Sequence, residues 1–140
     1  MEAHPVEVEV DISSGLPGFL IVGLPDKAVE EARERVRSAI KNSGARMPDR
    51  KITVNLAPAD LPKVGPAYDL AIAVGILLAS RQIDFDPKKS LFLGELSLSG
   101  NLRHINGILP NMFLARDKNF EQIFLPKVNV AEAALIDGVK

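Results

Sequence analysis

The segment NLAPADLPKVGPAYDL occupies residues 55–70 and joins three parts of the chain. It holds the end of an apolar strand, a loop rich in proline and glycine, and the start of a helix that is apolar almost all round. Many α/β enzymes hold a nucleophile at such a loop-to-helix junction, because a helix N-terminus offers free N–H groups and positive potential. The residue after Gly65 and Pro66 is Ala67, which has no nucleophilic group. The segment therefore predicts an active-site elbow that lacks its attacking residue.

Strands and helices alternate on both sides of this junction, which indicates an α/β fold. Apolar patterning predicts strands at residues 6–12, 19–22, 51–56, 91–98 and 122–125. Helical spacing predicts a first helix with Asp26 as its N-cap and Gly44 at its C-terminal end. Further helices are expected at about residues 67–80, 109–118 and 130–136. No repeat, linker or low-complexity tract interrupts the chain, so residues 1–140 are expected to form a single domain.

Composition excludes several classes of protein. The 140 residues are 46% hydrophobic and 25% charged, with a formal net charge of −1 and no cysteine. The absence of cysteine excludes a disulfide framework and a thiolate zinc site. The near-neutral charge gives no global reason to expect nucleic acid or an anionic membrane as partner. No apolar run approaches the length of a membrane span, and the first residues do not resemble a signal peptide. We therefore expect a soluble, cytoplasmic protein with no membrane partner.

Both ends of the chain indicate a fragment of a longer protein. The sequence opens within a few residues of an edge-like strand. It stops at Lys140, directly after an expected helix and where another strand would begin.

Two glycines have the spacing of a phosphate-binding loop. Gly18 and Gly23 enclose four residues, but Leu24 and Pro25 follow where that motif needs Lys and then Ser or Thr. The enclosed residues are also typical of a strand. We therefore expect no ATP at this segment and no cofactor in residues 1–140.

Histidines and carboxylates offer weak candidates for chemistry. His4 and His104 are far apart in sequence and have no cysteine or helical histidine pair beside them, so no metal site is expected. Asp60, Asp69 and Glu95 could converge as a catalytic carboxylate group. The alternative places Asp69 in the first turn of a helix, where negative charge is favoured, and Glu95 on the outward face of a strand.

Three cations form a stripe on the first helix. Arg33, Arg37 and Lys41 follow one another at intervals of four residues and so share one helical face. One interpretation is a solvated face with ion pairs to nearby carboxylates, which are Glu30, Glu31 and Glu34. The other is a ridge that contacts nucleic-acid phosphates. No aromatic residue lies among the cations, so base stacking is not indicated.

Long motifs along almost the whole chain resemble one family. They lie at residues 8–26, 31–37, 55–63, 68–73, 94–100 and 125–126. These residues are similar to the N-terminal region of the ComM/YifB family of Mg-chelatase-like AAA+ proteins. The resemblance implies that an AAA+ module with Walker motifs follows, and that ATP and magnesium bind only there. It also implies self-assembly into a hexameric ring and DNA branch migration in transformation.

The same resemblance implies a fold like the proteolytic domain of Lon and the C-terminal domain of RadA. In Lon-type proteases a catalytic Ser follows a Gly-Pro pair, and a catalytic Lys follows a Gly-Leu pair. The corresponding positions hold Ala67 and Leu109, which can neither attack a carbonyl nor accept a proton. We expect these two residues to face each other across a shallow cleft that has lost its protease dyad.

Three functions from different classes remain open. The first is a non-catalytic domain that helps assemble the ring, contacts DNA, or does both. The second is an adaptor that binds a peptide or protein partner in the cleft beside Ala67. The third is a residual hydrolase, which would need a Ser close to a Lys or His in space. None of these implies a small-molecule substrate.

Overall fold

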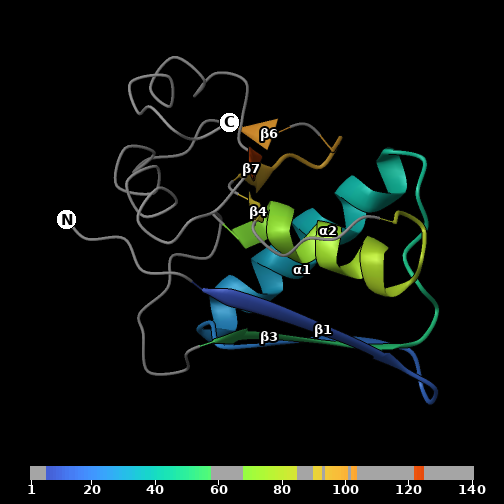
Figure 1. Cartoon of the computed structure of the whole chain (residues 1–140). Coiled ribbons are helices and arrows are strands. Elements are labelled where there is room, and N and C mark those ends of the chain that lie inside the picture. The colour runs from blue at the N-terminus through green and yellow to red at the C-terminus, as the bar shows by residue number, and fades with distance from the viewer. Residues whose placement is uncertain are drawn as a thin grey trace, which may run out of the picture.

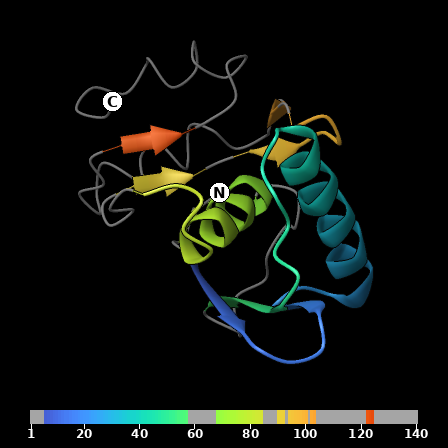
Figure 2. The same ribbon diagram turned by 90° about the vertical axis from the view of Figure 1, so that its right-hand side faces the viewer.

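The computed structural model of the chain describes residues 6–57, 68–84, 90–92, 94–100, 102–103 and 122–124. Two helices lie between a three-stranded sheet and two pairs of short strands (Figures 1 and 2). The larger sheet contains β1 (Glu7–Ser13), β2 (Gly18–Val22) and β3 (Lys51–Ala57). Its order is β1-β3-β2, with β1 antiparallel and β2 parallel to β3. The α/β class expected from the sequence is confirmed.

Each strand of the larger sheet places alternate residues on opposite faces, as the strand period requires. On β3, Ile52, Val54 and Leu56 point into the core and are almost completely buried. Phe19 and Ile21 of β2 lie beside them on the same face. The opposite face is open to solvent in this structure. It carries acidic residues along β1 and apolar residues along β2, which are Glu7, Glu9, Asp11, Leu20 and Val22.

Helix α1 (Asp26–Asn42) packs its one apolar stripe on the β2 side of the inner face of the sheet. Ala32, Val36, Ala39 and Ile40 form the stripe and are buried, as their spacing predicts. The expected N-cap is wrong by one residue: Pro25 takes the cap position and Asp26 is the first helical residue. Proline fits there because it has no N–H to satisfy and its ring pre-sets the backbone for the turn.

Helix α2 (Asp69–Ala79) lies in the middle of the molecule, which explains its apolar surface. It packs on β1, on α1 and on the short strands beyond it, so three of its sides face protein. Gly75 lets it approach the sheet closely: a Cβ there would lie 2.7 Å from Cγ2 of Val10. A helix enclosed on several sides has no broad polar face to display.

The strand expected at residues 91–98 is divided into two. Strand β4 (Ser90–Phe92) pairs in parallel with β7 (Gln122–Phe124), and β5 (Glu95–Leu96) pairs antiparallel with β6 (Leu102–Arg103). The division falls at Gly94, whose carbonyl oxygen accepts a hydrogen bond from the Leu70 amide of α2 at 3.1 Å. Strand β7 confirms the strand expected near residues 122–125. The helices expected at 109–118 and 130–136 lie outside the described residues.

Candidate functional site

An ion pair at the start of α2 is the most distinctive polar feature of the interior. Asp69 is completely buried, although it lies in the first turn of the helix, as expected. Arg35 of α1 donates two hydrogen bonds to its carboxylate, from Nε to Oδ2 at 2.5 Å and from Nη2 to Oδ1 at 3.2 Å. The Arg35 side chain is 17% exposed. This two-pronged arrangement fixes the relative positions of the two helices.

The same carboxylate also holds the second layer of strands. The main-chain amide of Leu96 donates to Asp69 Oδ2 at 3.1 Å. One residue further on, the Leu70 amide donates to the carbonyl oxygen of Gly94. Asp69 and Leu70 therefore tie β5 to the N-terminus of α2. The helix end that follows the elbow segment is anchored on two sides by elements distant in sequence.

Burial and pairing act in opposite directions on the two charges. Burial raises the pKa of the Asp69 carboxyl above its ordinary value, against the hydrogen bonds and charge of Arg35 and the amide of Leu96. Burial alone would lower the pKa of Arg35, but the hydrogen bond and charge of Asp69 outweigh it and raise that pKa. Arg35 therefore stays a cation, and Asp69 depends on its donors to remain charged.

These contacts leave Asp69 with a structural role. Both carboxylate oxygens accept hydrogen bonds from the protein and neither has solvent access. A general base must instead reach a substrate proton. Of the other two candidate carboxylates, Asp60 lies outside the described residues. Glu95 is half-buried on β5, and its negative charge also acts on the Arg35–Asp69 pair.

Spacing at intervals of four from Arg33 selects Arg37 and Lys41 among the helix cations and passes over Arg35. Two signals could have identified it. It lies three residues after Ala32 and four before Ala39, on the border of the buried stripe. In addition, α2 carries one charged residue in an otherwise apolar sequence, and a buried charge requires a partner.

The three residues of the expected basic stripe have different environments. Arg33 is half-buried, and its Nη1 donates to the carbonyl oxygen of Phe19 at 3.0 Å. Arg37 and Lys41 are exposed, and no carboxylate of the described residues lies within ion-pair distance of either. The glutamates of the helix thus form no ion pairs with this stripe in the structure. A DNA contact by the stripe stays a prediction, with two of its cations exposed.

The expected remnants of a protease dyad fall outside the described residues. Neither Ala67 nor Leu109 is described, so their expected approach across a cleft stays a prediction. Tyr68, which follows Ala67, packs against the hydrophobic core, and burial raises the pKa of its hydroxyl. Within the described ranges, no three His, Asp or Glu side chains are grouped to hold a metal ion. His4 and His104 are not among them.

The glycine pair at Gly18 and Gly23 encloses a strand, as expected. Residues Gly18–Val22 form β2, and Gly23 follows with a φ of +108°. A Cβ on Gly23 would lie 2.6 Å from the carbonyl oxygen of Leu56, so only glycine fits between the strands there. Packing against Leu56 therefore explains this glycine.

Comparison with known proteins identifies the family. Residues 8–129 match the profile of the family described as subunit ChlI of Mg-chelatase. Competence protein ComM of Haemophilus influenzae is 48% identical over 137 residues, which is 97% of this chain and 27% of that protein. YifB of Escherichia coli is 50% identical over 139 residues, or 99% of this chain and 27% of that protein. The chain therefore belongs to the Mg-chelatase-like family that includes ComM and YifB.

A more distant similarity connects the chain with proteases. Lon protease 2 of Bacillus subtilis is 30% identical over 109 residues, which is 76% of this chain and 19% of that protein. This similarity agrees with the expected Lon-like arrangement, while the naming of the fold stays a prediction. The chain spans just over a quarter of the length of ComM and YifB. Within the described residues, no helix is long and apolar enough to cross a membrane.

Proposed function

We propose that residues 1–140 form a non-catalytic module of a Mg-chelatase-like AAA+ ATPase, and that this module engages DNA in the assembled protein. ATP and magnesium would bind in a further module, and ring assembly would bring several copies of this domain around one axis. The similarity to a protein named for competence supports a role in handling DNA. A cytoplasmic location goes with that role.

The environment of Asp69 is the observation that supports a non-catalytic module. The Asp69 carboxylate, two residues after Ala67, is fully buried and has three hydrogen-bond donors from the protein. It therefore connects α1, α2 and β5, and its complete burial keeps both oxygens away from a substrate. Ala67, two residues earlier, has no group that could attack one. The arrangement supports a domain that keeps the loop-to-helix junction of an active site but has neither a nucleophile nor an accessible base there.

DNA engagement is tested with the full-length protein and a version that lacks residues 1–140. Binding to a 30-base-pair duplex is measured over a series of salt concentrations, with ATP hydrolysis without DNA as the control for an intact motor. We expect the shortened protein to hydrolyse ATP but to bind DNA more weakly and with a smaller salt dependence. Equal affinity and equal salt dependence in both proteins would refute the DNA role.

The adaptor function remains the alternative. It requires an apolar groove beside Ala67, and Ala67 lies outside the described residues. An adaptor would leave DNA binding unchanged when residues 1–140 are removed, so the same comparison separates the two functions.

A further inference from the structure

We infer that the phosphate backbone of DNA contacts one end of this domain, through Arg46, Arg50, Lys51 and Arg81, which we call the basic end. This inference rests on the proposed DNA role and assigns it to a different surface from the stripe on α1. Arg46 and Arg50 lie between α1 and β3, Lys51 is the first residue of β3, and Arg81 follows α2. All four are exposed.

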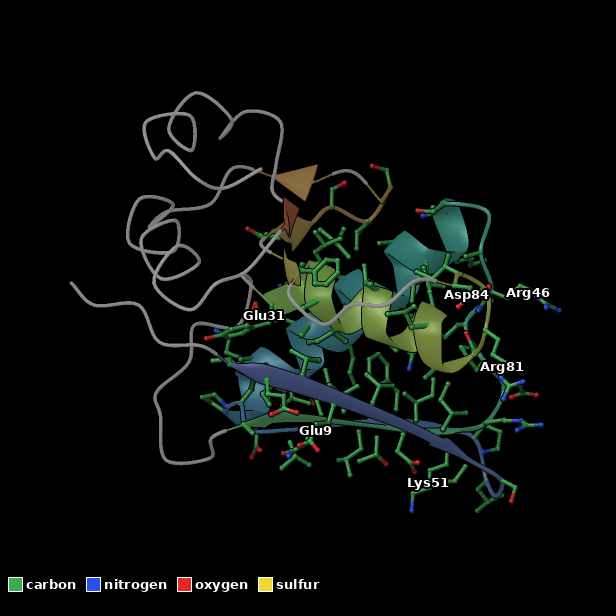
Figure 3. All side chains as sticks on the ribbon, in the orientation of Figure 1. Glu9, Glu31, Arg46, Lys51, Arg81 and Asp84 are labelled. Carbon is green, nitrogen blue, oxygen red and sulfur yellow. The ribbon has the colours of Figure 1, made fainter. Side chains whose placement is uncertain are left out.

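A pair of hydrogen bonds brings the two segments together. The Arg46 amide donates to Oε1 of Gln82 at 2.8 Å, and Nε2 of Gln82 donates to the Arg46 carbonyl oxygen at 2.6 Å. Gln82 thus pairs with the Arg46 backbone much as a neighbouring strand would. The next residue back from Gln82 is Arg81. In Figure 3, Arg46 and Arg81 project from the same end of the domain, with Lys51 below them on the sheet.

The four cations are available to a ligand. Among the described residues, no carboxylate lies within ion-pair distance of any of their side chains. The same two segments, residues 46–51 and 80–84, contain two carboxylates, Asp49 and Asp84. Four cations against two carboxylates give this end a positive charge in a chain whose overall formal charge is −1. Such segregation is what a near-neutral protein needs to attract a polyanion.

Arg81 supplies a second, independent observation. It is the one non-glycine residue with a positive φ in the described part of the chain, at 61°. It closes α2 in a Schellman motif: the Arg81 amide donates to Leu78, and the Gln82 amide donates to Leu77. The matching position after α1 holds Gly44, with a φ of +86°. Glycine adopts this conformation at no steric cost, whereas a side chain is disfavoured.

An arginine therefore occupies a backbone position that favours glycine, and the residue that follows it is hydrogen-bonded to the backbone of the exposed cation Arg46. Its charge also interacts favourably with the C-terminal end of the α2 dipole, which offers a purely structural reason for its presence. The two reasons make different predictions for Arg81→Gly. If the cation serves the helix, the variant loses stability. If the cation serves a ligand, the variant keeps or gains thermal stability and binds DNA more weakly.

The chemistry of the basic end fits nucleic-acid phosphates. Arginine presents a planar fork of donors that matches phosphate oxygens, and three of the four residues are arginine. No aromatic residue lies in residues 46–51 or 80–84, so bases would not be stacked. Binding should therefore be indifferent to sequence and strongly dependent on salt.

The test compares two double charge reversals in the full-length protein. Arg46→Glu with Arg81→Glu alters the basic end, and Arg37→Glu with Lys41→Glu alters the stripe on α1 by the same change in charge. Affinity for a 30-base-pair duplex is measured over a salt series. We expect the first variant to bind more weakly, with a log–log salt slope smaller by about two for each bound copy. The second variant should resemble the unaltered protein.

Arg81→Gly completes the experiment. We expect its melting temperature to be equal or higher, and its salt slope to fall by about one. A lower melting temperature with unchanged DNA binding would overturn the inference, because Arg81 would then serve only the helix. Equal losses in both double variants, or a loss confined to the Arg37 and Lys41 variant, would also overturn it. So would binding of the basic end to phosphatidylserine vesicles in place of DNA.

Two results distinguish a wrong contact surface from the absence of a DNA role. If the unaltered protein binds DNA and neither double variant changes that binding, the basic end is wrong and the DNA role stands. If the unaltered protein gains no affinity from residues 1–140, the DNA role itself is wrong.

Discussion

Asp69 and Arg35 lie 34 residues apart in sequence, and their side chains form an ion pair that joins the two helices of the domain. The carboxylate is completely buried and also accepts the Leu96 amide, so one side chain connects α1, α2 and β5. Desolvation of a charge is costly, and the cost is met only while its donors are in place. The pair therefore fixes the relative positions of these elements and makes the domain vulnerable to loss of either partner.

Arg35→Met should destabilise the domain by about 3 kcal/mol at neutral pH, because it leaves the Asp69 carboxylate buried without its cation. Arg37→Met is the matched control: Arg37 lies on the same helix, is exposed and has no ion-pair partner among the described residues. The control should change the free energy of unfolding by less than about 0.5 kcal/mol. Urea denaturation of residues 1–140 measures the free energy of unfolding of both variants. Equal losses would show that the Arg35–Asp69 ion pair contributes no more to stability than an exposed arginine does.

The cost of Arg35→Met should depend on pH. Burial already raises the pKa of Asp69 above the ordinary value of 3.8, and removing Arg35 removes the largest opposing influence. A carboxyl whose pKa is higher in the folded state binds its proton more tightly there, so protonation favours folding. The destabilisation should thus be complete above the folded pKa and shrink as the pH falls towards 3.8.

The double variant with Arg35→Met and Asp69→Asn is the control for this titration. Asparagine keeps an oxygen that can accept the Leu96 amide but has no carboxyl to protonate. Its deficit in the free energy of unfolding should therefore be independent of pH over the same range. A constant deficit for Arg35→Met alone would contradict the assignment of the effect to Asp69.

Gly75→Ala should destabilise the domain by about 1–3 kcal/mol, although alanine is the better helix former. Its Cβ would lie 2.7 Å from Cγ2 of Val10, closer than real side chains approach one another. Adding Val10→Ala should restore part of the loss by making room for the new methyl group. If Gly75→Ala stabilises the domain, α2 and β1 do not pack as closely as the structure shows.

Residues 1–140 alone should hydrolyse neither ATP nor peptides, since the sequence holds neither a phosphate-binding loop nor a Ser–Lys dyad. Ala67→Ser with Leu109→Lys should not create a useful protease, because a dyad must also be held in place by its supporting residues. Fluorogenic peptide and phosphate-release assays measure these activities. Robust peptide cleavage by the unaltered chain would contradict the inference that the protease dyad has been lost.

The sequence predicts the strands and helices of this molecule better than its polar contacts. Strand alternation and helical spacing locate the three strands of the larger sheet and α1, since burial of one face imposes a period that remains visible in the sequence. A glycine within a strand pattern is typical of a bulge or break, but the hydrogen bond that the Leu70 amide of a distant helix donates at Gly94 leaves no local signal. Long-range hydrogen bonds do not impose a local period.

The candidate site illustrates the same limit. Asp69 is correctly placed in the first turn of α2, but its burial depends on α1 and β5 packing over it. Arg33 and Arg35 lie two residues apart on different faces of α1. The border of the apolar stripe selects Arg35 as the cation next to the core, but its pairing with Asp69 depends on how α2 packs. Likewise, the basic end combines the segment that leads into β3 with the segment that follows α2. Hydrogen bonds of Gln82 bring the two together, so no spacing along one helix reveals it.

Hydrogen–deuterium exchange of the full-length protein, with and without a 30-base-pair duplex, tests the proposed DNA role most directly. It reports contact in the unaltered chain without substitutions. We predict that DNA slows exchange in peptides that cover residues 43–51 and 80–84, while peptides from the core of β3 and α2 are unchanged. Slower exchange elsewhere in residues 1–140 would move the contact to another surface of the domain. No change anywhere in residues 1–140 at saturating DNA would contradict the role proposed for this chain.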